Sequence, residues 1–163
     1  LVLMVGQGVL ASRSVFLERR IPLKLLMSLH RRCGALIGCL VLAHPLLILW
    51  ADEFSLFPLE WRYWPEFLGV FIVFFITAIV VTSVFRARLN IGYRQWQRVH
   101  RICTPVAVLL VFVHAWFVSE TYHHFVPRMG LFLLAGAGLA VFAGIYIRRG
   151  AGRVKAGENG EKK

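Results

Sequence analysis

Acidic residues and cysteines are both scarce in this chain of 163 residues. Only 8 residues are Asp or Glu, against 19 Lys and Arg, and the charged types together make up 17% of the chain. Cys33, Cys39 and Cys103 form neither a C-x-x-C pair nor a cluster of zinc spacing, so no disulfide framework or zinc module is indicated. With 58% hydrophobic residues and a mean hydropathy of +0.68, the composition nearly excludes a water-soluble globule.

Long hydrophobic runs stand where a soluble protein has polar segments. A bilayer core needs about 20 mostly apolar residues per helix, and four segments approach that length: 33–50, 67–85, 102–119 and 129–147. A shorter run over residues 1–11 would rise only about 16 Å as a helix, which is too little to cross a bilayer alone. The sequence therefore predicts an all-α integral membrane bundle of four full transmembrane helices plus a partial N-terminal one.

The connections between these runs are too short to hold a second folded domain. We expect one membrane domain over residues 1–148 and a disordered cytoplasmic tail over residues 149–163, where glycines alternate with charges.

Lysine and arginine lie almost entirely on one side of the expected helices. Residues 12–32, 86–101 and 148–163 carry 17 of the 19 basic residues, whereas the opposite connections hold only Arg62 and Arg128 beside five acidic residues. Because Lys and Arg are retained on the cytoplasmic face of short loops, this alternation predicts a multi-pass protein of the inner (plasma) membrane with a cytoplasmic C-terminus. The basic excess is then a topology signal, and no nucleic-acid partner is expected.

Four of the six histidines fall within or beside the apolar runs and form two pairs of equal spacing. His30 and His44 belong to the helix around 33–50, and His100 and His114 belong to the helix around 102–119. The shared spacing is about 40° short of four whole helical turns, so both histidines of a pair share one face, about 21 Å apart along the axis. Both helices run from inside to outside, which brings His30 level with His100 and His44 level with His114.

Two such helices facing each other would form two stacked histidine pairs. Two neutral imidazoles saturate a haem iron and favour electron transfer over ligand binding, and facing helices of a bundle commonly hold such a cofactor. The pattern therefore predicts two haems, with all four histidines as iron ligands. The alternative for a single intramembrane histidine is a polar group satisfied by a neighbouring helix. His123 and His124 lie in an outer loop, where a solvated surface pair is expected.

Small and basic residues near the inner pair are candidates for further cofactor contacts. Gly34 and Gly38 offer a flat strip beside His30 where a porphyrin can lie close, although close helix packing explains small residues equally well. Arginine at the membrane surface can pair with haem propionates, and positive-inside retention alone also accounts for it. The arginines in question are Arg31, Arg32, Arg98 and Arg101.

Two stretches carry a family resemblance. The string LHRRCGALIGCLVLAHPL over residues 29–46, with YRQWQRVHRICTPVAVLLVFVHAW over residues 93–116, resembles the ferric reductase-like transmembrane domain. That family includes ferric reductases, the membrane part of NADPH oxidases and the haem subunit of a periplasmic methionine sulfoxide reductase system. The resemblance implies that His30 and His100 bind an inner haem b, and that His44 and His114 bind an outer one.

The implied activity is that of a cytochrome b-like electron-transfer subunit of an oxidoreductase. Electrons would pass from a cytoplasmic flavin or quinol donor to an outer-side acceptor or partner oxidoreductase. Reductase members of the family continue into flavin- and nicotinamide-binding domains, which this sequence does not show, so a flavin or quinone is expected only through a partner. Two other classes stay open: a haem-free bundle using the histidines for proton or metal transport, and a structural anchor.

Overall fold

The computed structural model describes residues 1–12, 15–51, 53 and 60–161. Of these, residues 15, 16, 120, 123, 146 and 148–161 are described by their backbone only. Some of the charged residues counted above lie outside the described ranges: Arg13, Asp52, Lys162 and Lys163. The side chains of His123, Arg148 and Arg149 also lie outside the described part.

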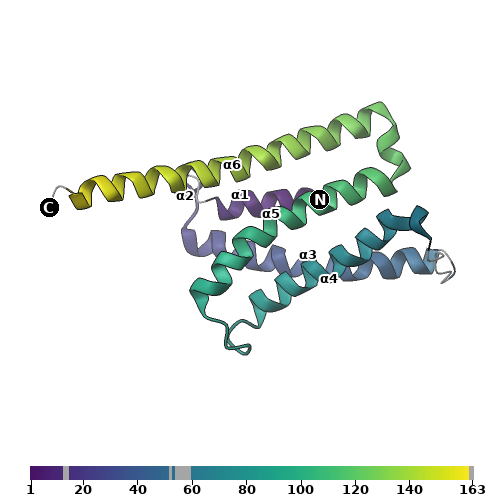
Figure 1. The fold of residues 1–163 in the computed structure, drawn as a ribbon, viewed down its shortest axis with the longest axis horizontal. Helices are drawn as coiled ribbons and strands as arrows, with labels where there is room; N and C mark the ends of the chain where they lie inside the picture. Colours follow the sequence, from purple (N-terminus) through teal and green to yellow (C-terminus); the bar gives the residue numbers. More distant parts are fainter. Residues whose placement is uncertain (13–14, 52, 54–59, 162–163) are drawn as a thin grey trace.

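Helices make up all the regular structure in the described ranges. In chain order they are α1 (Val2–Ala11), α2 (Val15–Glu18), α3 (Leu23–Ala51), η1 (Trp61–Tyr63), α4 (Trp64–Val84), α5 (Tyr93–Val118), η2 (Glu120–His123) and α6 (Phe125–Glu161). Figure 1 shows the long helices running side by side, with consecutive ones in opposite directions. The predicted all-α fold is confirmed.

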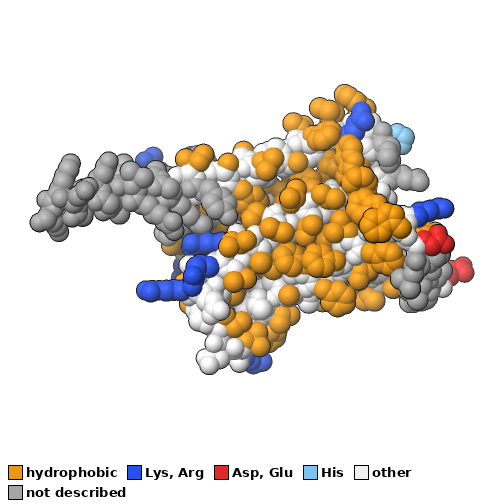
Figure 2. Space-filling model, in the orientation of Figure 1, with side chains coloured by type: hydrophobic (Ala, Val, Ile, Leu, Met, Phe, Trp, Pro, Cys, Tyr) orange, Lys and Arg blue, Asp and Glu red, His pale blue; other side chains and the backbone are white. Residues whose placement is uncertain are grey.

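Four helices are long and apolar enough to cross a membrane: Leu23–Ala51, Trp61–Val84, Tyr93–Val118 and Phe125–Ile145. They contain the four predicted runs, whereas α1 has only ten residues, as expected for a partial helix. Side chains of these helices are mostly exposed. Exposed apolar side chains are expected in a membrane protein, because the surface that faces lipid is as apolar as the interior. Figure 2 shows hydrophobic side chains covering the middle of the face in view.

Charges gather at the two ends of this hydrophobic region. One end, which we call the basic end, is formed by α2, the start of α3, the turn between α4 and α5, and the last part of α6. The other, which we call the acidic end, holds the end of α3 and the short helices η1 and η2, with Glu53 and Glu60 exposed there. In Figure 2, Lys and Arg concentrate at the left and Asp and Glu at the right. The separation of charge is that expected from the sequence.

Helix α4 lies at the centre of the packing. It contacts α3 on one side and α5 on the other, while α1 lies between α3 and α6. A small core of Ile37, Ile72, Ile76 and Ala107 joins α3, α4 and α5. In the described chain, α3 and α5 each pack closely on α4 but have no extensive contact with each other. The two histidine-bearing helices are therefore held apart by a shared neighbour.

The turn between α4 and α5 fixes how these two helices pair. The Arg86 guanidinium donates to the Ile91 carbonyl at 3.2 Å, and the Ile91 amide donates back to the Arg86 carbonyl at 3.1 Å. Asn90 adopts φ 52°, a left-handed conformation that asparagine tolerates better than most residues. Because this turn is tight, α4 and α5 form an antiparallel hairpin.

The last helix of the chain reaches into the segment expected to form the tail. Helix α6 continues through residues 149–161 to Glu161. The division into a domain ending at residue 148 and a separate tail stays a prediction.

Candidate functional site

The structure brings His30 of α3 and His100 of α5 together near the basic end. Each lies seven residues after the first residue of its helix, so the two reach the same level. Their ring centroids are 6.3 Å apart and their planes are inclined at 82°. The rings thus meet across the space that separates α3 from α5.

The two rings meet nearly at right angles, in an edge-to-face arrangement. Each neutral imidazole has one nitrogen that can bind a metal ion, so the pair offers two potential ligands from two different helices.

A cavity of about 420 Å³ lies beside this pair and is lined by both histidines. Its volume falls within the range of about 300–1,000 Å³ that is typical of cofactor sites. Gly34 also lines it, and a side chain added there would meet nothing within 4 Å. Most other lining residues are apolar, including Ile76, Ile79 and Val80 of α4.

Several polar atoms in the cavity wall are buried and have no hydrogen-bond partner among the residues that the structure describes. They are Nδ1 of His30, both amide atoms of Gln7 on α1, and Nε1 of Trp96 on α5. Gln7 is only 7% exposed. Leaving such a group unpaired costs about 1–3 kcal/mol, so a bound group that offers partners to these atoms would fit the site. The observation supports a polar or metal-containing cofactor in this cavity.

His100 has a defined environment on its own helix and on α4. Trp96 stacks on its ring at a centroid distance of 5.1 Å and an angle of 27°. On α4, the Ser83 hydroxyl oxygen lies 3.4 Å from Nδ1 of His100. Both contacts restrict the orientation of the imidazole.

The second histidine pair lies near the acidic end. His44 of α3 and His114 of α5 each lie 21 residues after the first residue of their helix, so both are found toward this end. Nδ1 of His114 lies 2.9 Å from the Pro65 carbonyl oxygen of α4. The His114 ring also covers Gly69, where an added Cβ would lie 2.5 Å from Cε1 of the ring. The predicted level of this pair agrees with its position in the structure.

The other predicted cofactor residues differ in their placement. Arg31 lines the cavity, and all four arginines are exposed at the basic end: Arg31, Arg32, Arg98 and Arg101. Gly38 is buried, and a side chain there would meet Val80 of α4 at 3.1 Å, which favours the close-packing alternative for this glycine. Cofactor contacts of these residues stay predictions. His124 is exposed at the end of η2, as expected for a surface residue.

Five residues around the histidines were not identified from the sequence: Gln7, Pro65, Gly69, Ser83 and Trp96. Gln7 is the only polar residue in the short run over residues 2–11, which marked it as unusual. Gly69 and Ser83 stand at the same interval along the chain as the two histidines of each pair. That shared interval is a signal in the sequence that could have identified Gly69 and Ser83 as neighbours of the histidines.

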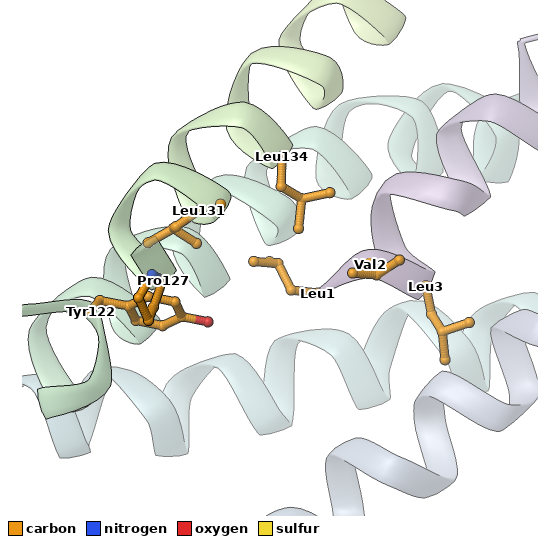
Figure 3. Close-up of a pocket in the computed structure, with 8 residues that line it drawn as sticks. Leu1, Val2, Leu3, Tyr122, Pro127, Leu131 and Leu134 are labelled. Carbon is orange, nitrogen blue, oxygen red and sulfur yellow. The ribbon is translucent and has the colours of Figure 1, made fainter. Parts of the chain in front are cut away.

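A second cavity of about 440 Å³ lies between the start of α1 and the start of α6. Leu1, Val2 and Leu131 line it, together with Tyr122 (Figure 3). None of the four paired histidines lines it. Among the described residues, no group of three or more His, Cys, Asp or Glu side chains is placed to hold a metal ion. A haem needs only two protein ligands, because the porphyrin supplies four nitrogens.

Comparison with known proteins gives the family. The model of one protein family, described as the ferric reductase like transmembrane component, matches residues 1–111, which is more than half of the chain. The chain belongs to this family. The match includes His30, His44 and His100, while His114 lies just beyond it. No curated protein and no solved structure matches the chain. Membership in the ferric reductase-like family supports a role in transmembrane electron transfer.

Proposed function

We propose that this member of the ferric reductase-like family carries electrons across the membrane through two stacked haem b groups. The observation that carries the proposal is the facing pair His30 and His100, whose ring centroids are 6.3 Å apart beside a cavity of about 420 Å³. The second pair, at the matching level of the same two helices, would supply a second site nearer the acidic end.

The four histidines would have one role in this account, which is to supply imidazole ligands to haem iron. His30 and His100 would bind the inner haem, and His44 and His114 the outer one. Haem supplies reversible one-electron chemistry at its iron, and two imidazole ligands leave no position for oxygen or substrate. Most of the residues that line the inner cavity are apolar. We assign no catalytic residue to the chain itself.

The direction of transfer follows from the distribution of charge. The basic end would face the cytoplasm, which places the C-terminus there and makes this the donor side. A separate flavoprotein or a quinol is the proposed donor, and exposed arginines at this end would attract an acidic protein partner. The acceptor, or a partner oxidoreductase, would act at the acidic end. The protein would then be the haem-binding subunit of an oxidoreductase in the inner membrane.

Histidine substitutions test the proposal directly. The purified protein should show the absorption spectrum of low-spin haem b, and both His30→Ala and His100→Ala should remove about half of the haem by removing the inner site. His44→Ala and His114→Ala should each remove the outer site. His124→Ala serves as the matched control, because this residue is exposed at the acidic end, and it should leave the haem content unchanged.

A protein without haem, or one whose haem content is unchanged in all four histidine variants, would contradict the proposal. A haem-free bundle that moves protons or metal ions through these histidines would then become the better account.

A further inference from the structure

Both histidines of α5 direct the same ring nitrogen, Nδ1, toward an oxygen of α4. His100 approaches the Ser83 hydroxyl at 3.4 Å, and His114 approaches the Pro65 carbonyl at 2.9 Å. The two oxygens belong to opposite ends of one helix. A single element therefore contacts both histidines of α5 in the same chemical way.

The contact at His114 has only one possible polarity. A carbonyl oxygen accepts and never donates, so the hydrogen bond requires a proton on Nδ1 of His114. Pro65 lies in the first turn of α4 and is buried, and its carbonyl has a second lone pair besides the one used within the helix. The close approach also depends on Gly69, because a Cβ at this position would lie 2.5 Å from Cε1 and 3.1 Å from both nitrogens of the ring.

The contact at His100 reaches the same polarity by another route. The Ser83 hydroxyl lies 2.6 Å from the Ile79 carbonyl of its own helix and donates its proton there. Its oxygen is then free only to accept, so Nδ1 of His100 donates to it. The interval from Gly69 to Ser83 equals that from His100 to His114, so the antiparallel hairpin brings each histidine to its own oxygen.

We propose that α4 sets the tautomer of both α5 histidines: Ser83 and the Pro65 carbonyl hold the proton on Nδ1 and leave Nε2 unprotonated. Metal-binding histidines commonly donate their other ring N–H to a carbonyl or similar acceptor, which fixes the tautomer and the ring orientation. Ser83, Pro65 and Gly69 are thus positioning residues. The tautomer itself does not depend on a cofactor, whereas the use of Nε2 as an iron ligand rests on the proposed function.

Nitrogen-15 NMR of histidine-labelled, chemically reduced protein measures these tautomers. Reduction makes any bound low-spin haem diamagnetic, so the ring nitrogens are observable whether or not the protein contains haem. His100→Gln and His114→Gln assign the two sets of signals. We expect a protonated Nδ1 and an unprotonated Nε2 for both residues. A proton on Nε2 of either one would overturn the proposal for that residue.

Substitutions on α4 separate the two contacts. Ser83→Ala should shift the His100 ring signals and leave those of His114 in place, while Ser83→Thr, which keeps the hydroxyl, should restore them. Gly69→Ala should shift only the His114 signals. Thr82→Ala and Gly130→Ala are matched controls, because the Thr82 hydroxyl bonds only to its own helix and a side chain at Gly130 meets nothing within 4 Å.

A measurement on the unsubstituted protein covers the case in which a variant fails to fold. Magnetisation transfer between Nδ1 of His114 and a carbon-13-labelled Pro65 carbonyl should show the hydrogen bond directly, and its absence would contradict the proposal. The outcomes also separate the two claims. Protonated Nδ1 atoms in a protein that binds no haem would support the tautomers and contradict the proposed function. Bound haem, together with ring signals that change in neither Ser83→Ala nor Gly69→Ala, would support the proposed function and contradict the proposed role of α4.

Discussion

At the scale of single residues, the four paired histidines were predictable and their neighbours were not. The equal spacing of the histidines in two helices of the same direction predicted two facing pairs, and the structure places His30 opposite His100 at the expected level. Gln7 was missed because its role depends on where α1 packs, and nothing in a ten-residue apolar run determines that. Ser83 and Gly69 act through helix register, which the turn at Asn90 determines.

Gln7 gives a prediction at this scale. Its side-chain amide is buried in the cavity wall without a partner, so Gln7→Leu should leave the thermal stability of the haem-free protein unchanged or slightly raised. If the amide pairs with the bound cofactor, the same change should weaken retention of the inner haem by about tenfold, the equivalent of about 1.4 kcal/mol. Haem titration of the apoprotein measures this. Gln95→Leu, at an exposed position of α5, is the control, and equal effects of the two changes would contradict the prediction.

At the scale of elements, the central position of α4 was the feature that sequence reasoning lacked. The apolar runs predicted which segments are helices, because membrane-length hydrophobic segments have few alternatives. They carried no information on which helix lies between which others, since side chains that face lipid and side chains that face protein are equally apolar. That α3 and α5 each pack on α4 rather than on each other emerges only from the three-dimensional packing.

The two glycines of α3 provide a matched pair of substitutions. Gly38 packs against Val80 at 3.1 Å, so Gly38→Leu should overpack the α3–α4 contact and destabilise the protein by about 1–3 kcal/mol. Gly34 faces the cavity with nothing within 4 Å, so Gly34→Leu should fill space that a porphyrin needs while leaving the fold intact. Thermal unfolding together with haem content distinguishes the two. Loss of stability at Gly34, or loss of haem without loss of stability at Gly38, would contradict the assignment.

At the scale of the whole molecule, the separation of charge was predicted from the sequence and is seen in the structure (Figure 2). The distribution of Lys and Arg predicted which connections share an end, and the alternating directions of the helices place them so. The separate tail beyond residue 148 stays a prediction, and helix α6 continues to Glu161. Helix continuation depends on the preceding turns as well as on local composition.

The orientation in the membrane gives a prediction for intact cells. A reporter that is active only in the cytoplasm should be active when it is fused after Lys163, because the basic end is retained inside. A cysteine introduced by Glu60→Cys, at the exposed acidic end, should react with an impermeant thiol reagent added outside. Arg88→Cys at the exposed basic end is the control and should stay unlabelled until the cells are opened. The reverse labelling pattern would exchange the donor and acceptor sides.

Electron transfer across a sealed bilayer is the most direct test of the central claim. Haem-loaded protein is reconstituted into liposomes that enclose ferricyanide, and a membrane-impermeant reductant is added outside. The account predicts bleaching of the enclosed ferricyanide with the unsubstituted protein, and almost none with His30→Ala, which lacks the inner site. Ferricyanide that stays oxidised in sealed vesicles, although the protein in them carries its full haem content and detergent releases the reaction at once, would contradict it.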